Sequence, residues 1–120
     1  MDIVNRVAVV LVPKKPYLDW ANSFADGGPT ILPAEAREHA VAFLVPDLEL
    51  LEETQQFITE NSARMFEYAL LGWMEDERDW PKFRNHLTLR EWFDVEVHDL
   101  LIDLGNDPIE VRRVNSSEDR

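Results

Sequence analysis

Two short apolar runs stand out along the chain, and a proline closes each of them. Arg6–Val12 reads Arg-Val-Ala-Val-Val-Leu-Val, and His39–Val45 contains the similar run Ala-Val-Ala-Phe-Leu-Val. Continuous apolar residues, many of them β-branched, are typical of strands buried on both faces. Pro13 and Pro46 end the two runs, because proline gives no N–H to a sheet. We therefore predict two strands at the centre of a sheet.

Two further segments have apolar residues at helical spacing. The first has the positions Tyr17, Trp20, Ala21 and Phe24, followed by Gly27 and Gly28. This pattern predicts a short helix directly after the first strand. A longer helix is predicted over Leu48–Trp73, kinked or divided at Asn61-Ser62. Its predicted inner stripe is Leu51, Ile58, Met65, Ala69 and Trp73.

The segment Leu89–Leu104 has the most complete helix pattern. Thr88 and Glu91 have the spacing of a capping box, and Gly105 stands where a C-cap glycine belongs. One face of this helix would be apolar: Leu89, Phe93, Val97, Leu100, Leu101 and Leu104. A strand is the alternative, because an alternating pattern is also present: Leu87, Leu89, Phe93, Val95 and Val97. We favour the helix on the strength of its two caps and its long stripe.

Together these elements predict an α+β fold in one domain over residues 1–113. The expected sheet has two or three strands and is covered on one face by about three helices. Ile109 and Val111 alternate with charged residues, so a short third strand over 109–113 is an open alternative. The two central strands could be parallel or antiparallel. The polar residues 114–120 are expected to form a disordered tail.

Charge and composition narrow the classes of partner. The chain has 24 acidic and 12 basic residues, a formal net charge of −12, which repels nucleic-acid phosphates. Cysteine is absent, which excludes thiol catalysis and thiolate metal sites. The longest apolar run, Val7–Val12, is far shorter than the roughly 20 residues that span a bilayer. The start of the chain lacks the basic region and cleavage site of a signal peptide. A cytoplasmic protein that binds neither nucleic acid nor membrane is expected.

Several aromatic and proline positions resemble those of a known group of proteins. The matching stretches are Lys-Lys-Pro-Tyr-Leu-Asp-Trp at 14–20, Leu-Val-Pro-Asp at 44–47, Trp-Pro-Lys-Phe-Arg at 80–84 and Trp-Phe-Asp-Val-Glu-Val-His-Asp-Leu-Leu-Ile-Asp-Leu at 92–104. In these stretches the chain resembles a family of small uncharacterised bacterial proteins, over most of residues 6–110. The resemblance implies a bacterial cytoplasmic protein with a self-contained domain. It implies no reaction, cofactor or catalytic residue.

One group of polar residues could support chemistry. If Leu89–Leu104 is a helix, Glu91, Asp94 and His98 share one of its faces. Two carboxylates and an imidazole could bind a metal ion or act as acid and base. No second cluster of ligands accompanies them, so we interpret this face as solvated surface and predict no metal and no cofactor. A small metal-dependent or acid–base enzyme using these residues remains the alternative function.

Tryptophan and arginine suggest a different kind of site. Trp80, Arg84 and Trp92 lie around an acidic turn, and these residue types dominate the hot spots of protein interfaces. Packing of the tryptophans in the core is the competing interpretation. The sequence contains no recognisable catalytic motif. It therefore favours a non-enzymatic interaction or adaptor protein, which binds a protein partner or associates with itself.

Overall fold

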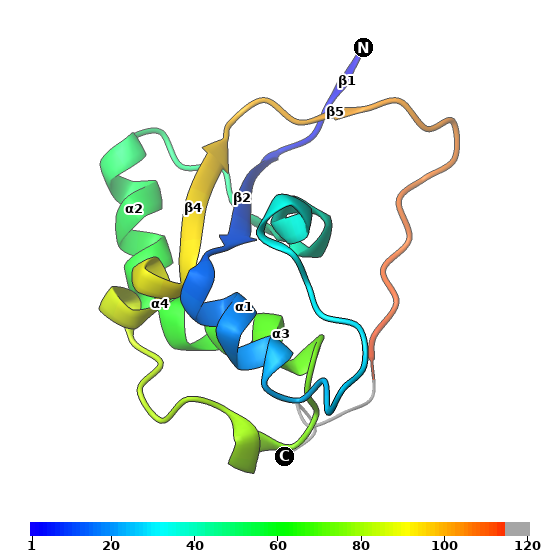
Figure 1. Ribbon diagram of the computed structural model, residues 1–120. Coiled ribbons are helices and arrows are strands. Elements are labelled where there is room, and N and C mark those ends of the chain that lie inside the picture. The colour runs from blue at the N-terminus through cyan, green and yellow to red at the C-terminus, as the bar shows by residue number, and fades with distance from the viewer. Residues whose placement is uncertain (115–120) are drawn as a thin grey trace.

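The computed structural model describes residues 1–114 as a single small α+β domain, as predicted. Its main sheet has three strands in the order β3-β2-β4, with β2 (Arg6–Pro13) in the centre (Figure 1). Both neighbours, β3 (Val41–Pro46) and β4 (Phe93–His98), are antiparallel to β2. The proposed tail at 114–120 lies, beyond Val114, outside the described residues.

The sheet has one apolar face and one mixed face. Across the three strands, Leu11 stands opposite Val41 on one side and Val95 on the other. Side chains alternate along a strand, so this row and its neighbours at every second position face the helices. The alternate row contains Val10 between Ala42 and Glu96. The 3-10 helix η1 (Pro33–His39) packs against β2.

Four α-helices complete the domain. They are α1 (Lys15–Asn22), α2 (Leu51–Glu60), α3 (Ser62–Leu71) and α4 (His86–Trp92), with a short 3-10 helix η2 (Glu77–Asp79) before α4. The largest fully buried side chains of the shared core are Phe66, Phe93, Leu11, Ile58, Leu70 and Leu89. None of the helices within residues 1–114 has the length and apolar character needed to cross a membrane.

The predicted long helix over Leu48–Trp73 divides at Asn61, within the predicted Asn61-Ser62 break. The Asn61 backbone N–H and side-chain amide both donate to the Phe57 carbonyl, at 3.0 and 2.9 Å. The Ser62 hydroxyl donates to the Ile58 carbonyl at 2.7 Å. Side chains that bond to the backbone one turn earlier favour a bend, which accounts for two helices in place of one.

The prediction of one helix over Leu89–Leu104 is wrong. A helix occupies only its start, because α4 ends at Trp92 and the chain continues directly into β4. The N-cap is Asn85, whose side chain accepts from the Thr88 N–H at 2.9 Å, so Thr88 does not begin a capping box. From Phe93 onward the alternating pattern prevails, since β2 offers a full edge for antiparallel pairing.

The end of the predicted helix also has another role. Ile102–Asp103 forms β5, which pairs antiparallel with β1 (Asp2–Ile3). Gly105 donates its N–H to Asp103 Oδ1 at 2.7 Å instead of ending a helix. Residues 109–113 form no strand, and the third strand of the sheet is β4. His39, the predicted first residue of the second strand, is the last residue of η1.

Candidate functional site

Trp80 and Arg84 make contacts within the domain. The Trp80 indole N–H donates to the Met74 carbonyl at 2.7 Å, and its ring packs against the core. Arg84 lies with its guanidinium carbon 5.7 Å from the centre of the Trp80 ring. It also donates to Glu67 Oε2 at 3.1 Å and to the Pro81 carbonyl at 2.8 Å. These contacts fix the loop between η2 and α4.

Trp92 belongs to an aromatic cluster around α1. Its ring centre lies 5.4 Å from that of Phe66 and 6.1 Å from that of Trp20. Tyr17 lies in the same cluster, and burial raises the pKa of its hydroxyl from 10.0 to about 12. The predicted interface at Trp80, Arg84 and Trp92 stays a prediction, but these three side chains are partly buried and have partners within the domain.

The three residues of the alternative site do not converge. Glu91 is exposed on α4, whereas Asp94 and His98 lie on the outer face of β4, opposite Val12 and Ala8. Asp94 and His98 are four positions apart along the strand, which separates them by about 13 Å. Within residues 1–114 no three His, Cys, Asp or Glu side chains form a group that could hold a metal.

Glu96 connects these strand residues to η1. Its Oε2 accepts from Arg37 at 2.7 Å, and its Oε1 lies 3.4 Å from His98 Nε2. Hydrogen bonds from Arg37 first, and from His98 second, hold the pKa of Glu96 below its usual value. The carboxylate therefore stays ionised as a structural partner of Arg37. Glu96 thus contacts both Arg37 and His98 on the outer face.

An open backbone edge runs along β3. Lys14 donates its N–H to the Trp92 carbonyl at 2.8 Å, so Lys14 directs its backbone groups toward β4. The N–H and C=O groups of successive residues in a strand point to opposite sides. Val9 is an odd number of positions from Lys14, so its backbone groups point toward β3, where it pairs with Phe43. Ala42 and Leu44 then direct their N–H and C=O groups away from β2. No other backbone of the described chain bonds to them.

The two residues with free backbone groups on this edge are also exposed to solvent. Ala42 is exposed, and Leu44 keeps 58% of its surface accessible. Pro46 ends β3, and proline is tolerated at an edge because its missing N–H would face solvent. At the other edge of the sheet, Val97 of β4 lines a pocket together with Leu51 and Thr54 of α2.

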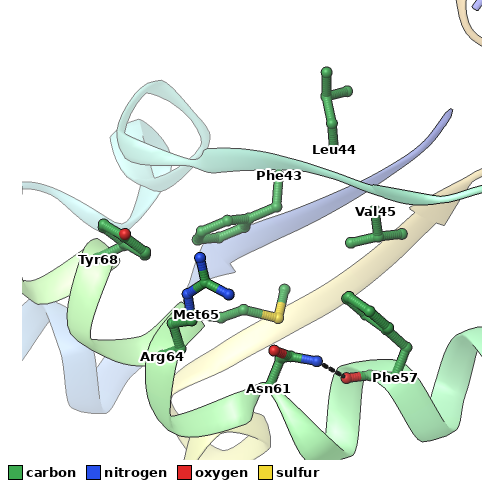
Figure 2. A pocket seen from close by; sticks show the side chains of 8 residues that line it. All are labelled: Phe43, Leu44, Val45, Phe57, Asn61, Arg64, Met65 and Tyr68. Atoms are coloured by element: carbon green, nitrogen blue, oxygen red, sulfur yellow. Dashed lines mark hydrogen bonds between the residues drawn. The ribbon is translucent and has the colours of Figure 1, made fainter. Parts of the chain in front are cut away.

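A cavity of about 140 Å³ adjoins the β3 edge, between that strand and helices α2 and α3. Figure 2 shows Phe43 pointing into it from β3, while the Leu44 side chain points away to the opposite face. Leu44 therefore lines the cavity with atoms close to its backbone, not with the end of its side chain. The other lining residues are Val45, Phe57, Asn61, Arg64, Met65 and Tyr68.

The chemistry of this cavity is mainly apolar with one cation. Phe57 and Phe43 are half-buried, and Met65 is buried. The Phe43 and Tyr68 rings lie 6.4 Å apart. Arg64 is exposed and is the one charged residue that lines the cavity. The cavity is therefore suited to an apolar side chain from a strand that runs beside β3.

The sequence pattern does not reveal this edge. The apolar run at 39–45 is typical of a strand buried on both faces, and the residues of β4, the second neighbour of β2, fit the pattern of the predicted helix Leu89–Leu104. An edge strand should be short, end in proline and precede charged residues. Pro46 and Asp47 carry that signal, although Pro13 gives a similar one after the central strand.

A second cavity of about 370 Å³ lies beside α1, where Lys14, Lys15 and Asp19 come together. Lys14 Nζ donates to the Arg90 carbonyl at 3.0 Å, and Lys15 is paired with Asp19 at 2.7 Å. Asn22 bonds Ile31 through both its side-chain oxygen and nitrogen. The polar groups of this cavity thus already have partners within the chain.

Comparison with known proteins adds no relative of established function. No family model, no curated protein and no solved structure matches the chain.

Proposed function

We propose that the protein is a non-enzymatic interaction module, which binds an extended segment of another polypeptide along β3. The observation that carries this proposal is the free edge of Ala42 and Leu44 beside an apolar cavity. Peptides that add a strand to a sheet gain affinity from main-chain hydrogen bonds and specificity from pockets for alternate side chains. The β3 edge has both features.

The expected partner segment is apolar at every second position and basic at its flank. One of its apolar side chains would enter the cavity, while its backbone pairs with Ala42 and Leu44. The chain between residues 47 and 60 has five exposed acidic residues and no basic one: Asp47, Glu49, Glu52, Glu53 and Glu60. This charge, within a chain of net −12, favours a basic partner and disfavours nucleic acid.

The partner would be a protein segment, in keeping with the predicted adaptor role. The bacterial and cytoplasmic assignments stay predictions that rest on the resemblance and the composition.

Selection from a displayed library of cysteine-free eight-residue peptides tests the proposal. We expect enriched peptides to alternate apolar residues and to carry Lys or Arg. Leu44→Pro should weaken their binding at least tenfold, because it removes one outward N–H without touching the bonds to β2. Leu44→Ala is the matched control, since it retains the N–H and shortens a side chain that points away from the cavity. No enrichment, or equal binding to both variants, would overturn the proposal.

A further inference from the structure

We infer that the segment that pairs with β3 is Pro108–Val114 of a second copy of this chain. This inference rests on the proposed function and names its partner. Within the described chain, Pro108–Val114 has no regular secondary structure and makes no backbone–backbone hydrogen bond. Figure 1 shows it as an extended trace after β5. The same molecule thus has an unpaired edge strand and an unpaired extended segment.

The residues of this segment favour a strand. Ile109, Val111 and Val114 are β-branched, and between them stand the charged residues Glu110, Arg112 and Arg113. All three apolar side chains are exposed, with Val111 reaching 80%. Exposed apolar side chains grouped in one short segment are typical of a surface that binds a partner. Pairing with β3 would cover them.

The cavity beside β3 fits one of these side chains. An apolar cavity of about 150 Å³ is large enough to bind benzene, so the cavity of about 140 Å³ can take the side chain of Ile109 or Val111. These two residues are two positions apart and would lie on the same face of a strand. The backbone between them then reaches the N–H and C=O groups of Ala42 and Leu44.

Charge supports the same pairing. Arg112 and Arg113 are adjacent cations in a chain of net −12, and both are exposed. Arg113 shares a strand face with Ile109 and Val111, so it would point to the helices beneath β3. Among these helices, α2 has the exposed acidic residues Glu52, Glu53 and Glu60, and Arg64 is the one cation among the residues that line the cavity. Ile109 and Val111 thus stand two positions apart with two arginines at their flank, as expected of the partner segment.

Two copies can pair reciprocally, each with its segment on the β3 edge of the other. Each copy supplies one segment and one edge, so a reciprocal exchange forms a closed dimer with two identical contacts. The main sheet of each copy would gain a fourth strand beside β3. Leu44, on the outer face of β3, would then gain a neighbouring strand.

Sedimentation equilibrium of the full chain tests the inference. We expect a concentration-dependent dimer, and Val111→Asp should raise its dissociation constant at least tenfold. Leu104→Asp is the matched control, because Leu104 is 90% exposed but precedes the segment, and it should leave the dimer unchanged. Both side chains are exposed, so neither substitution should disturb the fold. Equal effects of the two substitutions, or none, would overturn the inference.

A labelled synthetic peptide of residues 107–114 provides the second measurement. We expect it to bind the full-length Val111→Asp protein, whose own segment is impaired and whose β3 edge is free. Leu44→Pro added to that protein should abolish binding. A monomeric chain that does not bind this peptide overturns the inference. The proposed function survives that result if the library peptides still bind at Leu44, and it fails if they do not. A dimer that Leu44→Pro dissociates but Val111→Asp does not would mean that a different strand occupies the edge.

Discussion

Arg84 joins two segments of the fold by donating its Nε–H to Glu67 Oε2 at 3.1 Å. Glu67 belongs to α3, whereas Arg84 lies in the loop before α4. The Arg84 side chain is 30% exposed, and its guanidinium also donates to the Pro81 carbonyl. The contact thus fixes the loop against a helix of the core.

Replacement of this arginine should therefore affect stability. We expect Arg84→Ala to lower the free energy of unfolding by about 1–2 kcal/mol, since a charged hydrogen bond and a partly exposed ion pair are lost together. Urea denaturation measures the change. Lys82→Ala, an exposed cation in the same loop, is the control and should change stability by less than about 0.5 kcal/mol. Equal stabilities of the two variants would mean that Arg84 is free to serve the predicted interface.

Two leucines in the segment 89–104 should respond in opposite ways. Leu89 is fully buried in the core, and Leu100 is 61% exposed. We expect Leu89→Ala to cost about 2–5 kcal/mol through the cavity it leaves, and Leu100→Ala to cost less than about 0.5 kcal/mol. Thermal or urea unfolding distinguishes them. A large loss at Leu100 would restore the continuous helix and contradict the turn into β4.

Asn85 should contribute to stability as the cap of α4. Its side-chain oxygen accepts from the Thr88 N–H at 2.9 Å and from the Thr88 hydroxyl at 3.2 Å. Asn85→Ala should cost about 1 kcal/mol in urea denaturation, whereas Asn85→Asp should retain most of the stability. If both substitutions cost the same, the cap contributes little and the start of α4 is held by packing.

Tyr17 should make the protein sensitive to alkali. Burial raises the pKa of its hydroxyl to about 12, whereas an unfolded chain ionises near 10. Between pH 10 and pH 12 the unfolded state binds fewer protons than the folded state. The free energy of unfolding therefore falls as pH rises through this range, by about 2–3 kcal/mol in all. Below pH 10 this contribution is fully retained. Urea denaturation from pH 9 to 12 should show a smaller fall for Tyr17→Phe, and identical curves would contradict the burial of the hydroxyl.

Addition of Zn²⁺ should leave the melting temperature unchanged. Glu91 lies on α4 while Asp94 and His98 lie far apart along β4, so they cannot coordinate one ion together. A ligand that binds only the folded state would raise the melting temperature in proportion to its affinity. A Zn²⁺-dependent rise that His98→Ala abolishes would revive the enzyme alternative.

The two apolar runs were sufficient to predict β2 and β3, because continuous β-branched residues closed by proline have few other structures available. The helix around Tyr17 was also predictable from its spacing. The boundary at Trp92 was not, because Phe93 and Val97 fit both a helical stripe and a strand. The choice was decided by β2, which offers its second edge only once the chain has folded. The β3 edge could not be identified for the same reason, since an edge exists only when the order of the strands is known.

The central position of β2 has a consequence for synthesis on the ribosome. β2 is synthesised before its partner β4, in which Phe93 pairs with Pro13. One edge of this apolar strand therefore has no partner strand until β4 has left the ribosome. Contacts between residues far apart in sequence slow folding, and an unpaired apolar strand promotes aggregation during that wait. Chains arrested between Leu71 and His98 should therefore depend more on chaperones than the finished protein.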